Sequence, residues 1–108
     1  MTQHKPVVLI TGATGQIGGD TLRNLLNDDS ITLVAAVRSP AKAEPFEAQG
    51  IRTVILDFDK EETLAPALQG IDRAFLVTGY TVHMLRQSKA FVDQAKKAGV
   101  QHIVHLGA

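Results

Sequence analysis

The chain of 108 residues contains no cysteine and no tryptophan, and it has only one tyrosine. Without cysteine it forms no disulfide or thiolate–metal site, and it offers no cysteine nucleophile. No apolar run approaches the length of a membrane span, and the short polar segment before Val7 lacks the apolar centre of a signal peptide. We therefore expect a protein of the cytoplasm that does not interact with membranes.

An excess of charge of either sign is also missing, because eleven basic side chains balance eleven acidic ones. The two kinds are mixed along the chain, so nothing indicates a surface for nucleic acid or for an anionic membrane. The length fits a single domain over residues 1–108. Within that length, apolar segments alternate regularly with amphipathic ones.

Five strand-like segments alternate with helix-like ones, which predicts parallel strands joined by crossover helices. Most of these strands are continuously apolar, as expected for strands covered on both faces. We predict an α/β fold with a doubly wound, five-stranded parallel Rossmann sheet in the order 3-2-1-4-5. The expected strands are Val7 to Thr11, Thr32 to Val37, Arg52 to Leu56, Ala74 to Thr78 and His102 to Leu106, and the clearest expected helices span residues 16–27, 40–49 and 82–98.

The remaining helix, between the third and fourth strands, gives conflicting signals. Asp59 followed by Glu62 has the spacing of a capping box, which would begin a helix at once. Pro66 would then remove a hydrogen bond inside that helix. A helix that begins near Thr63 avoids the conflict, because Pro66 then lies in the first turn.

Three glycines follow the first predicted strand and lead into the first predicted helix. In a dinucleotide-binding turn, Gly12 would permit the tight turn, Gly15 the approach of a pyrophosphate to the backbone, and Gly18 the close packing of the helix. Such turns also occur without a ligand, but the preceding strand and the apolar stripe of the helix favour phosphate binding at the helix N-terminus. The predicted phosphate-binding residues are Gly12, Ala13, Thr14, Gly15, Gln16, Ile17 and Gly18.

The residue at the end of the second strand meets the adenosine ribose in such folds. Arg38 occupies this position, where its guanidinium would bind the 2′-phosphate of NADP, whereas an acidic residue would bind the free hydroxyl of NAD. Ser39 and Lys42 would add a hydroxyl and a second positive charge, although an exposed lysine here is equally consistent with a solvated surface. One charge-assisted bond contributes about 1.5–3 kcal/mol, which predicts a roughly ten- to hundredfold preference for NADP(H) over NAD(H).

Two further groups of residues follow predicted strands. After the third strand, Asp57 would accept a hydrogen bond from the adenine amine and Phe58 would cover the ring, although Phe58 is also consistent with a plain core residue. After the fourth strand, Thr78, Gly79 and Tyr80 lie where an open α/β sheet binds its ligand. We therefore predict that both groups contact the cofactor.

The segments Thr11 to Gly18, Val37 to Pro40 and residues 98–106 together resemble the NmrA-like branch of the atypical short-chain dehydrogenase/reductases. The resemblance covers nearly the whole chain. It implies the cofactor-binding part of an NADPH-dependent reductase that acts on a quinone or a related acceptor, or a regulator that senses NADP(H) without turning it over. It also implies longer relatives with a sixth strand and a substrate-binding lobe, which this chain lacks.

The sequence assigns no catalytic residue. Catalytic relatives in the wider superfamily carry a tyrosine with a lysine four residues later, but Tyr80 is followed at that spacing by Met84. His83 is the histidine best placed to approach a nicotinamide, although a surface histidine at a helix start is the simpler interpretation. The histidines do not have the spacing of a metal site. The first loop argues against a receiver or flavodoxin-like domain. A receiver would require a carboxylate cluster at the ends of its early strands, where this chain has Thr11 and Gly12, and a flavodoxin-like domain would require a Ser/Thr-rich phosphate loop.

The last predicted strand, His102 to Leu106, would form an exposed sheet edge unless another chain pairs with it or covers it. We therefore expect self-association through this edge. The substrate itself cannot be identified from these residues.

Overall fold

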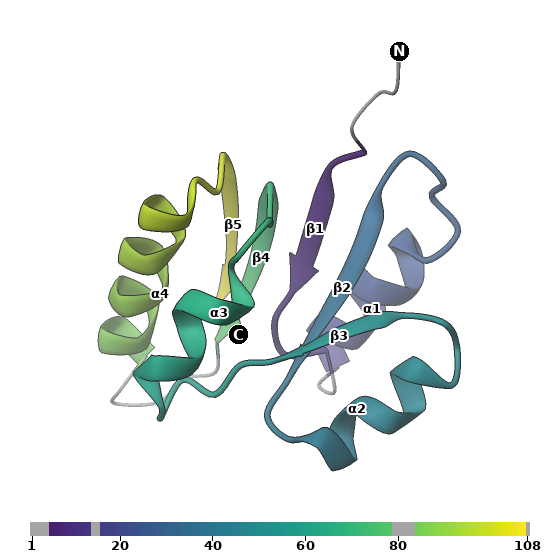
Figure 1. Cartoon of the computed structure of the whole chain (residues 1–108), viewed down its shortest axis with the longest axis horizontal. Helices are drawn as coiled ribbons and strands as arrows, with labels where there is room; N and C mark the ends of the chain where they lie inside the picture. The colour runs from purple at the N-terminus through teal and green to yellow at the C-terminus, as the bar shows by residue number, and fades with distance from the viewer. Residues whose placement is uncertain (1–4, 14–15, 79–83, 108) are drawn as a thin grey trace.

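The computed structural model describes residues 5–13, 16–78 and 84–107. Its strands form one parallel sheet in the order β3-β2-β1-β4-β5 (Figure 1), which confirms the predicted doubly wound Rossmann order. The strands are β1 (Val7–Ile10), β2 (Thr32–Val37), β3 (Arg52–Ile55), β4 (Arg73–Thr78) and β5 (His102–Gly107). β3 and β5 therefore form the two edges of this sheet.

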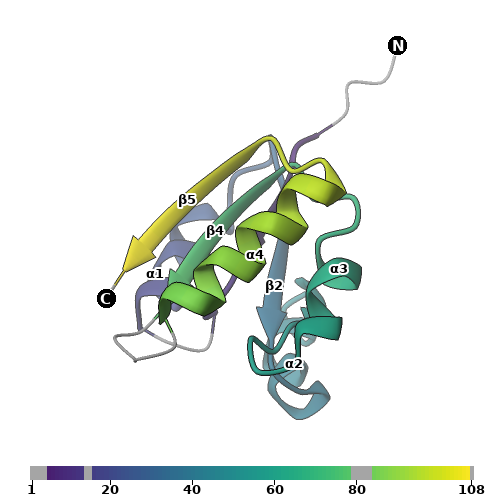
Figure 2. The same ribbon diagram turned by 90° about the vertical axis from the view of Figure 1, so that its left-hand side faces the viewer.

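The helices cover both faces of the sheet. They are α1 (Gln16–Leu25), α2 (Pro40–Glu47), the short α3 (Leu64–Ala67), which continues the 3₁₀ turn η1 (Glu61–Thr63), and α4 (Met84–Ala98). Figure 2 shows α4 lying across β4 on one side of the sheet, with α1 behind it. Among the described residues, no helix has the length and apolar character needed to cross a membrane.

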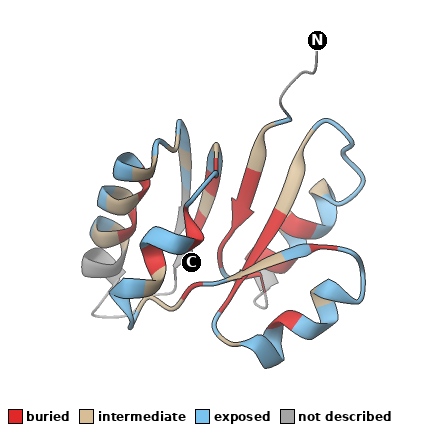
Figure 3. Cartoon of the chain, in the orientation of Figure 1, coloured by how far each residue is buried: buried red, intermediate tan, exposed pale blue. Residues whose placement is uncertain are grey.

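Two hydrophobic clusters show why the strands are apolar on both faces. On one face, Leu9 and Val34 pack with Phe91 of α4 and with α3. On the other face, Ile10 and Ala35 pack with Leu22 of α1, and α2 adds its partly buried Phe46. Figure 3 shows the buried residues on the strands and on the sheet-facing sides of the helices. Burial on both faces explains why the strands could be located from continuous apolar runs.

The predicted element boundaries agree with the structure to within about two residues, apart from the predicted helix start at residue 82, which lies outside the described residues, and one local signal. The Asp59–Glu62 spacing, which conflicted with Pro66, forms no capping box, because Lys60 is the N-cap of η1 and makes no side-chain capping bond. The predicted start near Thr63 is confirmed, since α3 begins at Leu64 and contains Pro66 in its only turn. Asp59 has a different partner, which belongs to the candidate site.

Candidate cofactor-binding site

The turn between β1 and α1 is fixed by glycine conformation and by contacts with β4. Gly12 has a φ of 64°, in the left-handed region that glycine adopts without strain. The neighbouring Thr11 is buried, and its backbone N–H and its hydroxyl both donate to the carbonyl of Phe75, at 3.1 and 3.0 Å. The turn is therefore anchored to β4, a central strand of the sheet, just after the carboxyl end of β1.

Helix α1 packs directly against this turn at Gly18. A Cβ atom added there would lie 2.1 Å from the carbonyl oxygen of Gly12 and 2.8 Å from that of Thr11. No side chain fits in that space, so the predicted packing role of Gly18 is confirmed. Ala13 is buried beside the turn, whereas Thr14 and Gly15 lie outside the described residues. Gln16 and Ile17 provide the first backbone groups of α1.

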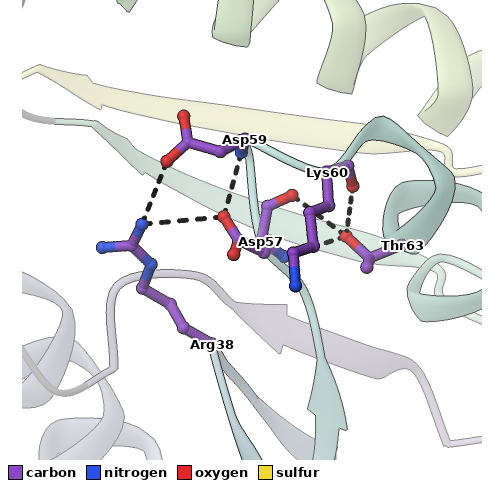
Figure 4. A network of polar contacts seen from close by, with 5 residues as sticks. All are labelled: Arg38, Asp57, Asp59, Lys60 and Thr63. Carbon is purple, nitrogen blue, oxygen red and sulfur yellow. Dashed lines mark hydrogen bonds and ion pairs between the residues drawn. The ribbon is translucent and has the colours of Figure 1, made fainter.

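Arg38 and Asp57 follow neighbouring strands and are brought together by the sheet. The N–H of Leu56 donates to the carbonyl of Val37 at 2.8 Å, which joins the ends of β2 and β3. Nη2 of Arg38 lies 3.2 Å from Oδ2 of Asp59 and 3.6 Å from Oδ1 of Asp57 (Figure 4). The arginine predicted to bind a 2′-phosphate therefore faces two carboxylates, an arrangement that the sequence analysis did not predict.

The loop that carries these carboxylates is held by the hydroxyl of Thr63. This oxygen accepts a hydrogen bond from the N–H of Asp57 at 2.9 Å, and it lies 3.0 Å from the carbonyl oxygen of Asp57 and 2.7 Å from that of Lys60. Oδ1 of Asp57 in turn accepts a hydrogen bond from the N–H of Asp59 at 2.9 Å. Figure 4 shows these contacts closing the loop on itself, so the carboxylates are presented from an ordered support.

Phe58 points from the same loop into the core. Its ring is tilted by 52° relative to that of Phe91, with the ring centroids 6.0 Å apart. Phe58 is only partly buried and packs against the cluster beneath α4. Its ring thus packs against the core from the loop, and its contact with an adenine ring stays a prediction.

Lys42 lies apart from the Arg38 network. It is exposed in the first turn of α2 and lines an open hollow of about 410 Å³ between α1 and α2, together with Ala13 and Arg23. Ser39 is the N-cap of α2, but its hydroxyl makes no capping bond. The structure thus brings Lys42 close to the β1–α1 turn through Ala13 rather than into contact with Arg38.

The residues predicted after the fourth strand are described only in part. Thr78 is the last residue of β4 and pairs in register with Gly107 of β5. It therefore lies at the carboxyl end of its strand, as Arg38 does after β2. Gly79, Tyr80 and His83 lie outside the described residues. In the described part of the chain, no group of three or more acidic or histidine side chains is placed to hold a metal ion.

A family model described as NAD(P)H-binding matches residues 12–108. The chain belongs to this family. It is 37% identical over 98 residues to the NAD(P)H azoreductase of Xenophilus azovorans, covering 91% of this chain and 34% of that protein. It is 30% identical over 103 residues to an NmrA-like family domain-containing protein of Dictyostelium discoideum, with 90% and 34% covered. The predicted NmrA-like membership is confirmed by these similarities.

The solved structure of an NADPH-dependent quinone oxidoreductase from Escherichia coli, complexed with NADPH, has a similar fold. The TM-score is 0.80 at 36% sequence identity, and the match covers 92% of this chain and 35% of that chain. This chain therefore spans about a third of the length of the relatives that it matches. The family membership and the position of the glycine turn together make this end of the sheet the candidate NAD(P)H site.

Proposed function

We propose that this NAD(P)H-binding domain prefers NADP(H) to NAD(H) and belongs to an NADPH-dependent reductase of quinones or related acceptors. The observation that carries the proposal is Arg38, an exposed arginine at the carboxyl end of β2, next to the strand that leads into the glycine turn. A guanidinium there matches the charge and the geometry of a 2′-phosphate. The names of the azoreductase and of the quinone oxidoreductase support reduction with NAD(P)H or NADPH.

In this proposal, the pyrophosphate binds along the turn from Gly12 to Gly18. The first turn of α1 has backbone N–H groups without partners inside the helix, and the helix dipole adds partial positive charge. The absence of a side chain at Gly18 keeps the helix close to the turn, so these donors converge on one region. The residues assigned to this subsite are Gly12, Ala13, Thr14, Gly15, Gln16, Ile17 and Gly18.

The positions of the other parts of the cofactor follow from the order of the strands. We assign the 2′-phosphate to Arg38 with support from Lys42, and the adenine to the loop of Asp57 and Phe58. Thr78, Gly79 and Tyr80 would line the part of the site beyond β4. The cofactor supplies the hydride, and the protein orients it and excludes competing reactions.

Titration of the 108-residue chain with NADPH and with NADH tests the binding part of the proposal. We expect NADPH to bind at least severalfold more tightly, since the 2′-phosphate gains a charge-assisted contact. Equal affinity for the two cofactors would contradict the preference, and binding of neither would contradict the site. NADPH oxidation with quinone, azo, flavin and aldehyde acceptors then tests the reductase. Binding without turnover by any of them would favour an NADP(H)-sensing regulator.

The edge of the sheet at β5 supports a proposal of self-association. β5 is the outermost strand next to β4, and Val104 on it is 44% exposed. An edge strand with exposed apolar side chains is a template for pairing with another chain. We expect an oligomer by light scattering, and Val104→Lys to shift it towards the monomer. A wild-type monomer at high concentration would contradict this proposal.

A further inference from the structure

We infer that Asp59 lowers the preference of this site for NADP(H), because its carboxylate partly neutralises the guanidinium of Arg38 and would repel a 2′-phosphate bound there. The inference rests on the proposed function, because it takes Arg38 as the ligand of that phosphate. It identifies a specificity-determining residue that neither the glycine turn nor the end of β2 contains.

The two side chains are exposed and already in contact. Nη2 of Arg38 lies 3.2 Å from Oδ2 of Asp59, with 69% of the arginine side chain and 67% of the aspartate side chain exposed. Both groups are therefore accessible to a ligand that approaches the end of β2. Before any ligand binds, the positive charge of Arg38 is partly neutralised.

Asp57 has a different role from Asp59, although both carboxylates face Arg38 (Figure 4). The Asp57 side chain is 16% exposed, and its Oδ1 accepts the backbone N–H of Asp59 at 2.9 Å. Its own backbone is held by Thr63 on both the N–H and the carbonyl side. Asp57 therefore belongs to the frame of the loop, whereas the carboxylate of Asp59 extends from that frame to Arg38.

A 2′-phosphate would bring a charge of about −1.5 to −2 to the same guanidinium. Both carboxylates contact Nη2, so Nη1 and Nε are the donors that a phosphate would use without displacing them. The phosphate and the Asp59 carboxylate would then repel each other across one guanidinium. Repulsion between exposed groups is partly screened, so we expect Asp59 to weaken NADPH binding without preventing it. NADH carries a hydroxyl at this position and avoids the repulsion.

The variant Asp59→Asn removes the charge and keeps the size of the side chain. In titrations at low salt, we expect it to bind NADPH about two- to fivefold more tightly than the wild type, the range of one exposed ion pair. Its affinity for NADH should stay the same, and the gain for NADPH should shrink at high salt. Asp59→Glu should keep the wild-type ratio. Glu62→Gln is the matched control, because it removes an exposed charge from the same segment outside the Arg38 network.

Three results would overturn the inference: no change in Asp59→Asn, an equal gain for both cofactors, or weaker NADPH binding. The last of these would mean that Asp59 positions Arg38 for the phosphate. Arg38→Ala separates this failure from failure of the proposed function. If Arg38→Ala binds NADPH as well as the wild type does, the assignment of the 2′-phosphate is wrong and the inference fails with it. If Arg38→Ala loses affinity for NADPH while Asp59→Asn gains none, the inference alone fails.

Discussion

Gly18 of α1 lies against the carbonyl group of Gly12, so that a Cβ at position 18 would come within 2.1 Å of that oxygen. Gly12 has a left-handed φ of 64°, a conformation that glycine adopts without strain. The two glycines therefore depend on each other, one for the direction of the turn and the other for the space that the turn needs. Together they fix where the N-terminus of α1 lies relative to the end of β1.

This dependence predicts that Gly18→Ala is destabilising and weakens cofactor binding. The new methyl group would meet backbone atoms, which cannot rotate away. We therefore expect a loss of about 1–3 kcal/mol in the free energy of unfolding. Gly19→Ala is the matched control, because a Cβ there would lie 3.2 Å from the carbonyl oxygen of Ala13. The better helix propensity of alanine offsets that contact, so the control should stay within about 1 kcal/mol of the wild type. Denaturant unfolding of both variants, with NADPH titration, checks the difference, and equal stability would contradict it.

The conformation of the loop from Asp57 to Lys60 should depend on the hydroxyl of Thr63. Thr63→Val keeps the shape of the side chain but leaves the N–H of Asp57 and two loop carbonyls without that partner. We expect a loss of about 1–3 kcal/mol in the free energy of unfolding and faster hydrogen exchange at the Asp57 amide. Thr63→Ser retains the hydroxyl and should preserve most of the protection. If the valine and serine variants exchange alike, the hydroxyl does not hold the loop.

Asp28 should titrate below the usual range of an aspartate. The hydrogen bond from the Ser30 hydroxyl, followed by the one from the Ser30 N–H, lowers the pKa of the Asp28 carboxyl from its ordinary value of 3.8. Both bonds favour the charged form in the folded state. The stabilisation is therefore present above the ordinary pKa and is lost as the pH falls through the lowered one.

An NMR titration of the Asp28 carboxyl in wild type and in Ser30→Ala tests whether the Ser30 hydroxyl lowers the pKa of Asp28. We expect Ser30→Ala to raise the pKa of Asp28 towards its ordinary value, because the larger of the two contributions is removed. Ser39→Ala makes the same change at the N-cap of α2, away from Asp28, and should leave the titration where it was. Identical Asp28 titrations in the wild type and in Ser30→Ala would contradict the assigned cause.

Much of the fold could be predicted from the sequence because the strands are buried on both faces. Residues such as Val34 and Ala35 pack into opposite clusters, so the whole strand has to be apolar. The ends of helices are harder to predict, because they depend on the contacts of individual side chains. At α3, a local Asp59–Glu62 pattern suggested a cap, whereas the tertiary contact of Asp59 with Arg38 uses that side chain instead.

The candidate site could be predicted only where backbone geometry alone sets the role of a residue. The contact of Gly18 with Gly12 follows from the spacing of the glycines in a strand–turn–helix unit. The partners of Arg38 depend on which strands are neighbours, and they meet because the register pairs Val37 with Ile55. The sequence predicts the order 3-2-1, and from it residues that follow β2 and β3 are expected to meet. That step would have pointed to Asp59.

The preference for NADP(H) depends most directly on whether Arg38 binds the 2′-phosphate. The measurement is the affinity of wild type and of Arg38→Ala for NADPH and for NADH. Arg52→Ala is the matched control, because Arg52 begins the neighbouring strand β3 and so lies at the opposite end of the sheet from Arg38. We predict that Arg38→Ala weakens NADPH binding about tenfold and leaves NADH binding unchanged, as expected for the loss of one charge-assisted contact. Arg52→Ala should change neither affinity. An equal loss of affinity for both cofactors in Arg38→Ala, or no loss for either, would contradict the account.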